Sequence, residues 1–163
     1  MSEVSVSNTD WAILSDLKDA LAAATVSGSP VFQAVDLSTS NQRARETRLT
    51  HSPMAVVRYV RTAEHWLPDD VLGCVLSAEI ILAAKADTES ARLAECLRLQ
   101  NVAMNAIEAS PPADAESWGE ADGEYRRKLK WGGPVLDTDA DEPWGVCVVP
   151  LEVGFTVSGH TGR

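Results

Sequence analysis

The sequence lacks the motifs by which many enzymes and metalloproteins are recognised. No serine lies in a nucleophile-elbow motif, and no glycine-rich loop leads from a predicted strand into a helix. The three histidines, His51, His65 and His160, are far apart, and no two have the spacing of metal ligands. We therefore expect no catalytic residue set, no metal site and no cofactor.

Cysteine is scarce, and long apolar runs are absent. Cys74, Cys96 and Cys147 are odd in number and widely spaced in apolar segments, which is typical of reduced core thiols in a cytosolic protein. The longest apolar stretch, Val71 to Ala84, is too short to span a bilayer and contains Glu79. The first residues also lack the basic start and apolar run of a signal peptide. We expect a soluble protein with no membrane partner.

Positive charge is in deficit. Lysine and arginine number 14 against 24 aspartates and glutamates, giving a formal net charge of −10. Such a chain is a poor autonomous binder of nucleic acid, because phosphates attract lysine and arginine. The charges are segregated, however, with basic residues at 43–48 and 126–130 and acidic residues at 108–124 and 137–142. These blocks are either solvated faces or complementary surfaces that meet in an assembly.

The stretch "DTDADEPWG", residues 137–145, contains four carboxylates within six residues. Asp137, Asp139 and Asp141 match the first three ligand positions of an EF-hand loop. Glu142 and Val148, however, occupy the positions that require glycine and glutamate. We therefore predict a solvated hairpin loop that binds no calcium, whose charges discourage pairing between sheet edges.

Apolar spacing predicts two amphipathic helices. The first begins at Thr9 or Asp10 and ends before "SGSP" at 27–30, and the second follows an N-cap at Asp87-Thr88 and ends before Pro111-Pro112. The first predicted apolar stripe consists of Trp11, Leu14, Leu17, Leu21 and Ala24. The second consists of Leu93, Cys96, Leu97, Met104 and Ile107.

Strands are predicted at 31–36, 53–62, 71–84, 125–131 and 135–137, with a turn at 64–70 and a long polar loop at 37–50. Periodicity alone does not separate a strand from a helix at 71–84, and Gly73 and Ser77 favour a strand. The clearest strand closes the chain. Its alternating apolar residues are Cys147, Val149, Leu151, Val153, Phe155 and Val157. Pro150 lacks an N–H group, so we expect this strand at a sheet edge or with a bulge.

These elements predict an α+β fold, a single domain with a mostly antiparallel (mixed) sheet and two main helices packed on it. The domain is expected to span residues 9–158. A flexible N-terminal arm is expected at 1–8 and a C-terminal tail at 159–163.

The order of elements resembles that of the phage tail terminator family, small proteins that cap the head-proximal end of a tail tube. The resemblance rests on "DWAILSDLKDAL", "SPMAVVRYV", "AEIILAAKADTESARLAECLRL" and "PWGVCVVPLEVGFTV", and it covers residues 9–158. The polar 37–50 segment departs from the usual pattern, so the resemblance assigns it no role.

The resemblance implies a structural virion protein without enzymatic activity, assembled in the host cytoplasm and located at the head-proximal end of the tail. It implies a hexameric ring that stops growth of the tube and docks the head-tail connector or stopper protein. DNA would pass through the lumen without specific binding, and an acidic ring would repel it. Alternative hypotheses are another neck, tail-completion or adaptor protein, which could bind a partner along a sheet edge, and a small cytosolic enzyme.

A ring of this kind needs two different, complementary patches on each subunit. The basic candidates are Arg126, Lys128 and Lys130, and the acidic candidates are Asp137, Asp139, Asp141 and Glu142. Exposed ion pairs contribute only about 0–1 kcal/mol each, so apolar contacts must hold the ring. Trp66 and Trp144, both expected in loops, are the predicted anchors.

Overall fold

The computed structural model describes residues 9–38, 49–67, 71–110 and 129–158. The helices are α1 (Thr9–Ala22) and α2 (Glu89–Ala109), and a short hairpin joins β1 (Thr25–Val26) to β2 (Ser29–Pro30). The remaining strands are β3 (Ala34–Ser38), β4 (Met54–Leu67), β5 (Val71–Lys85), β6 (Leu129–Trp131), β7 (Val135–Asp141) and β8 (Trp144–Ser158).

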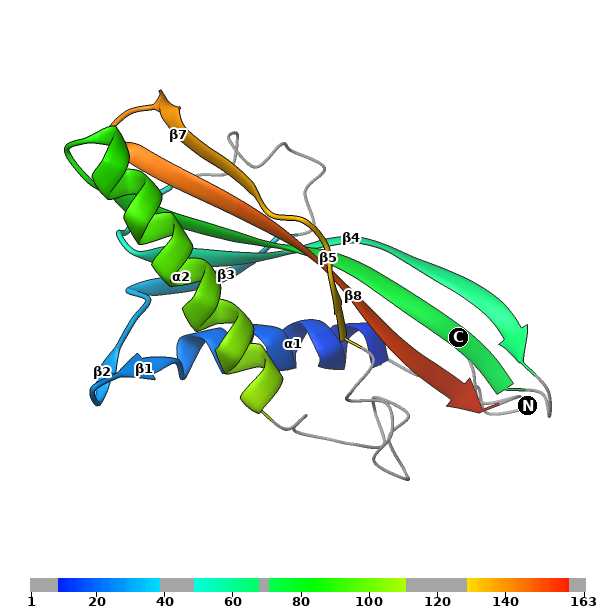
Figure 1. Cartoon of the computed structure of the whole chain (residues 1–163). Helices are drawn as coiled ribbons and strands as arrows, with labels where there is room; N and C mark the ends of the chain where they lie inside the picture. Colours follow the sequence, from blue (N-terminus) through cyan, green and yellow to red (C-terminus); the bar gives the residue numbers. More distant parts are fainter. Residues whose placement is uncertain (1–8, 39–48, 68–70, 111–128, 159–163) are drawn as a thin grey trace.

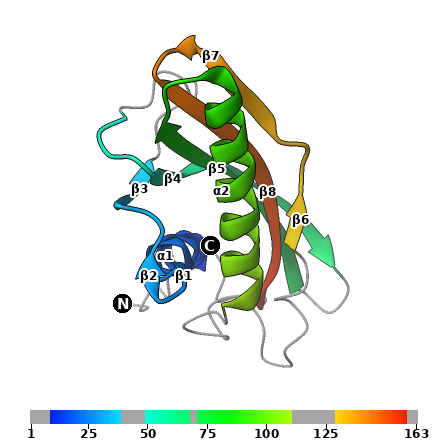
Figure 2. The same ribbon diagram turned by 60° about the vertical axis from the view of Figure 1, so that its left-hand side comes forward.

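These six strands form one mixed sheet with the order β3-β4-β5-β8-β6, and β7 also pairs with β8. β3 is parallel to β4, and the other pairs are antiparallel. Both helices pack on the same face of the sheet (Figures 1 and 2). The predicted α+β fold, with a mostly antiparallel sheet and two helices, is confirmed. The predicted arm at 1–8, the tail at 159–163 and most of the polar loop lie outside the described residues.

β5 is the central strand, and side chains on both of its faces are buried. Leu76, Ile80 and Leu82 face the helices and belong to the main core. Ile81 and Ala83 face the opposite side and belong to a second apolar cluster with residues of β4 and β8. A strand buried on both faces needs no alternation of apolar and polar residues. This explains the continuous apolar run and confirms the strand predicted at 71–84.

The helices are where the sequence predicts them, but their buried stripes are partly different. In α1, Leu14, Leu17 and Leu21 are buried as expected, whereas Trp11 is 54% exposed. At about 100° per residue, Trp11 lies roughly 120° around the helix from Leu17. Ile13, which the predicted stripe omits, takes the buried place near the start of the helix.

In α2, the buried residues include Cys96 and Ile107, as predicted, but Leu93 and Leu97 are 43% and 44% exposed. The full buried set is Arg92, Cys96, Leu99, Ala103 and Ile107. The first part of the helix packs closely on β8. A methyl group added at Gly145 of β8 would lie 3.0 Å from side-chain atoms of Arg92 and Cys96.

Three predicted strand boundaries are wrong. β3 begins at Ala34 rather than residue 31, and Val31 and Phe32 are core residues that precede it. β4 continues to Leu67, so residues 64–67 are not part of a turn. β7 extends to Asp141. In β4 the neighbouring strand supplies a continuous ladder over residues 64–67, and in β7 Asp141 pairs with Trp144 beyond a register shift that follows Asp137. In both cases strand pairing outweighs the polar composition of the segment.

The expectation that β8 is an edge strand or carries a bulge is also wrong. β8 pairs with β5 along its whole length without a shift of register, and its other side pairs with β6 and β7. Pro150 falls at the interruption between β6 and β7, where the Gly132 N–H group donates to the Pro150 carbonyl at 2.8 Å. The N–H and C=O positions of one strand residue point the same way. The side of Pro150 that lacks an N–H group therefore faces the gap between β6 and β7, and the sheet loses no hydrogen bond there.

Candidate assembly surface

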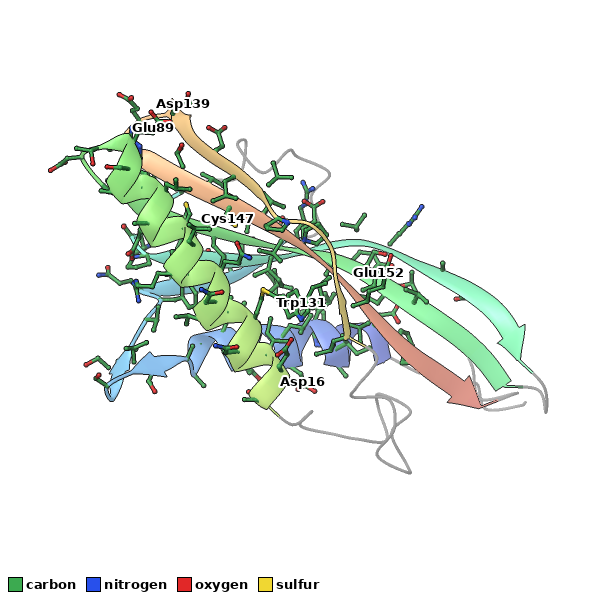
Figure 3. All side chains as sticks on the ribbon, viewed as in Figure 1. Asp16, Glu89, Trp131, Asp139, Cys147 and Glu152 are labelled. Carbon is green, nitrogen blue, oxygen red and sulfur yellow. The ribbon has the colours of Figure 1, made fainter. Side chains whose placement is uncertain are left out.

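The predicted acidic residues lie at one end of the sheet, where β7 turns into β8. Asp137, Asp139 and Asp141 are in β7 itself, not in a loop, and only Glu142 belongs to the turn. Figure 3 shows Asp139 at this tip, near Glu89 in the first turn of α2. Carboxylates near a helix N-terminus interact favourably with the helix dipole. The acidic tip is thus a compact part of the fold formed by two strands and a helix end.

Arg92 of α2 anchors this tip, although sequence reasoning did not single it out. Its side chain is almost fully buried, and its Nε donates to the Thr138 carbonyl at 2.5 Å. Nη1 donates to the Ala86 carbonyl at 2.9 Å, and Nη2 lies 3.3 Å from Glu142 Oε1. The guanidinium therefore joins the start of α2 to β7 and to the turn. Its spacing of four, seven and eleven residues from Cys96, Leu99 and Ala103 was a signal that could have placed it on the buried stripe.

The two predicted tryptophan anchors are in strands, not loops. Trp66 is in β4, where its backbone pairs with Leu72, and its side chain is not described. Trp144 opens β8, is half-buried, and has Lys85 Nζ 5.1 Å from its ring centroid. This cation–π contact orients the indole at the acidic end of the sheet. The structure therefore places Trp144 beside the acidic tip, while Trp66 belongs to the opposite end of the long strands.

Of the predicted basic residues, only Lys130 is described, whereas Arg126 and Lys128 lie outside the described residues. Lys130 is exposed on β6 and is the cross-strand partner of Glu152. Asp137 pairs with Val146, six residues from Glu152 along β8. At about 3.3 Å per residue, Lys130 and the acidic tip are roughly 20 Å apart. They do not neutralise each other within one chain.

The face of the sheet opposite the helices, here called the helix-free face, carries a second group of charges. Arg58 of β4 forms an ion pair with Glu79 of β5, and its Nη1 atom is buried without a hydrogen-bond partner. Beside this pair, Glu79, Lys130 and Glu152 border a cleft of about 270 Å³. Figure 3 shows Glu152 in this region, away from the acidic tip. Trp131 packs on the other face, where its Nε1 donates to Glu108 of α2 at 2.8 Å.

The cysteines lie in the core, as predicted, and all three are free thiols. Burial raises the pKa of Cys96 to about 11 and that of Cys147 to about 12. The nearby Glu95 carboxylate also raises the pKa of Cys96, and Cys96 raises that of Cys147. Both thiols are therefore protonated at neutral pH, a state in which they are weak nucleophiles and weak metal ligands.

Among the described residues, histidine, cysteine, aspartate and glutamate side chains form no group of three or more that could hold a metal ion. Of the two described helices, neither is long and apolar enough to cross a bilayer. No protein-family model matches the chain, and no curated protein is significantly similar to it.

Proposed function

We propose that this protein is a tail terminator, a ring-forming virion protein that caps the head-proximal end of a phage tail tube. In this role it stops polymerisation of the tube and forms the docking surface for the head connector. The observation that carries the proposal is the order of elements: α1, strands β3 to β5, α2 and strands β6 to β8 form one α+β domain. This is the layout that the resemblance to the tail terminator family implies.

The arrangement of charges supports a ring. A closed ring is built from a heterologous interface, in which two different patches of each subunit meet. Lys130 and the acidic tip are separate patches on the same sheet, six residues apart along β8. Across subunits, such charges mainly affect the association rate and its dependence on salt, while apolar contacts supply most of the affinity.

The test combines the purified protein with the tube protein of the same phage under conditions in which tubes elongate. The proposal predicts that tubes stop growing and that negative-stain images show a ring at one end. Rings should form more slowly as salt is raised, because screening weakens electrostatic steering. Tubes that grow past the added protein without a terminal ring would contradict the proposal.

A matched pair of variants separates the charge effect from general damage. Lys130→Glu reverses an exposed charge on the proposed surface, and Lys18→Glu reverses a charge on α1, away from that surface. We expect the first variant to slow ring formation at low salt and the second to have little effect. Equal slowing by both variants would show that net charge, not the Lys130 patch, governs association.

A further inference from the structure

Two exposed leucines lie about one turn apart on α2. Leu93 and Leu97 are 43% and 44% exposed, and a spacing of four residues places them only about 40° apart around the helix. Single exposed apolar residues are normal on a protein surface, whereas neighbouring ones form a patch that a partner can cover. This pair is here called the leucine patch.

The leucine patch lies on the flank of α2 that turns toward β6. Glu108 follows Leu97 by eleven residues, which is three full turns and about 20° more, so the two residues share this flank. Trp131 of β6 donates from Nε1 to Glu108 Oε1 at 2.8 Å. This hydrogen bond fixes the direction in which the flank points.

Negative charge borders the leucine patch. Glu89 precedes Leu93 by four residues on the same flank, and Figure 3 shows it near Asp139 of the acidic tip. Arg92 is in the same part of the helix, but its side chain is almost fully buried and interacts with Glu142. The leucine patch therefore fits a partner surface that combines apolar and basic groups.

The cleft on the helix-free face has this composition. Val60 of β4 and Pro150 of β8 supply apolar walls, and Lys130 of β6 borders the opening. Ser77 and Gly132 also line the cleft, and because they have little or no side chain they leave its space open. Its volume of about 270 Å³ is just below the range of about 300–1,000 Å³ for small-molecule pockets. A cleft of this size suits an apolar side chain of a partner protein.

The charges around the cleft have a positive excess. Glu79 is balanced by its ion pair with Arg58, and Glu152 is the cross-strand partner of Lys130. Arg61, in the same row as Lys130, adds one basic residue to these two pairs. The surroundings of the cleft are thus opposite in sign to the border of the leucine patch.

We propose that the leucine patch of one copy binds in the cleft of the next copy, with Glu89 directed toward Lys130. This inference rests on the ring assembly proposed above and assigns the apolar contact of its interface. The occupant is a second copy because the chain carries both halves of the contact, each apolar and opposite in charge to the other. The halves lie on opposite faces of one sheet, so the contact is heterologous and repeats from copy to copy until the ring closes.

Leu97→Gln tests the apolar contact, because glutamine is also a good helix former but removes apolar surface. Val26→Thr is the matched control, since Val26 is 49% exposed in the β1–β2 hairpin, outside both surfaces. Circular dichroism and urea unfolding should show that both variants are folded. We expect Leu97→Gln to weaken self-association about tenfold in sedimentation velocity and to lower the fraction of tube ends that carry rings. Val26→Thr should behave like the wild type in both assays.

Ser77→Leu tests the other half of the contact by filling the cleft, and Ser77→Ala, which leaves the cleft open, is its control. We expect Ser77→Leu to reduce ring formation as Leu97→Gln does. Charge reversal tests the pairing of Glu89 with Lys130. Glu89→Lys and Lys130→Glu should each slow association at low salt. The double variant should recover most of the wild-type rate, because every interface then contains the reversed pair.

Each outcome decides between the two proposals. If either folded variant, Leu97→Gln or Ser77→Leu, forms rings as the wild type does, the interface is overturned and the proposed function still stands. Wild-type copies that associate through the leucine patch but do not cap tubes would retain the interface and overturn the function. A wild type that stays monomeric at every concentration and on tubes, an equal loss in Val26→Thr, or a double variant no faster than the single ones would contradict the interface. A Leu97→Gln variant that self-associates normally but no longer binds the tube protein would assign the leucine patch to that partner instead.

Discussion

Replacing Arg92 with alanine should loosen the acidic tip from α2. The variant loses donors to the carbonyl groups of Thr138 and Ala86 and the ion pair with Glu142. Leaving a partly buried acceptor without a donor costs about 1–3 kcal/mol. The side chain of Glu142 is 69% exposed, so its ion pair contributes less than about 1 kcal/mol. We therefore expect a loss of about 3 kcal/mol in the free energy of unfolding, most of it from the two carbonyl bonds.

Urea unfolding followed by circular dichroism measures this loss directly, and for a domain of this size it corresponds to a fall in Tm of about 6–12 °C. Glu142→Gln removes only the ion pair and should cost less than about 1 kcal/mol. Arg98→Ala is the control for loss of an exposed arginine of α2, because Arg98 forms its ion pair with Glu95 on the surface of the same helix. The reasoning fails if Glu142→Gln is as destabilising as Arg92→Ala, or if Arg92→Ala is no worse than Arg98→Ala.

Three further predictions concern packing, protonation and metal binding. Gly145→Ala should destabilise the fold by about 1–3 kcal/mol, because its methyl group would crowd α2, whereas Gly133→Ala, with open space around it, should be nearly neutral in the same urea assay. The raised thiol pKa of Cys147 stabilises the fold fully below about pH 9, and this contribution is lost as the pH rises from 9 toward 12. Between pH 8 and 10 the free energy of unfolding should therefore fall less steeply with pH in Cys147→Ala than in the wild type, by up to about 1.4 kcal/mol per pH unit. Equal slopes in the two proteins would contradict this. Thermal melts with calcium and with chelator should coincide, and a rise of several degrees with calcium would show that residues 137–142 bind the ion.

The helices and the two central strands were predictable because their signals are local. Thr88 caps α2 through a hydrogen bond from the Ala91 N–H group to its hydroxyl, as its place before the helix indicated. The apolar alternation along β8 marked its helix-covered face, where Leu151, Val153 and Phe155 are buried. These features depend on the period of a helix or strand, which a single sequence displays.

The parts that sequence reasoning missed depend on contacts between distant segments. β7 is a strand because it pairs with β8, although its aspartates are typical of a turn. Arg92 is buried because carbonyl groups from two other segments accept its hydrogen bonds, and no periodic pattern records those partners. The candidate surface was predicted only in part: Lys130 and Glu142 are exposed as expected, while Trp66 and Trp144 are strand residues.

The charges on the helix-free face change what a ring would present to DNA. Cross-strand register places Arg58 opposite Glu79, and it places Arg61, Ser77, Glu152 and Lys130 in one row across the sheet. These two rows hold three basic and two acidic residues, so this part of the face does not carry the acidic excess of the chain. If a ring turned this face toward its lumen, acidic repulsion would not account for the free passage of DNA that the proposed function requires.

In such a ring, pairing of most basic groups on this face would keep contact with DNA weak. Arg58 already has a carboxylate partner, and Lys130 lies beside Glu152, which leaves little unbalanced positive charge for phosphates. Glu152→Gln should therefore raise non-specific binding of duplex DNA at low salt, whereas Glu89→Gln on α2 removes the same charge from the other face and should not. Fluorescence anisotropy with a random duplex measures both variants, and the gain should disappear as salt is raised, because released counterions drive such binding. An equal gain in both variants would show that DNA responds to the net charge of the chain and not to this face of the sheet.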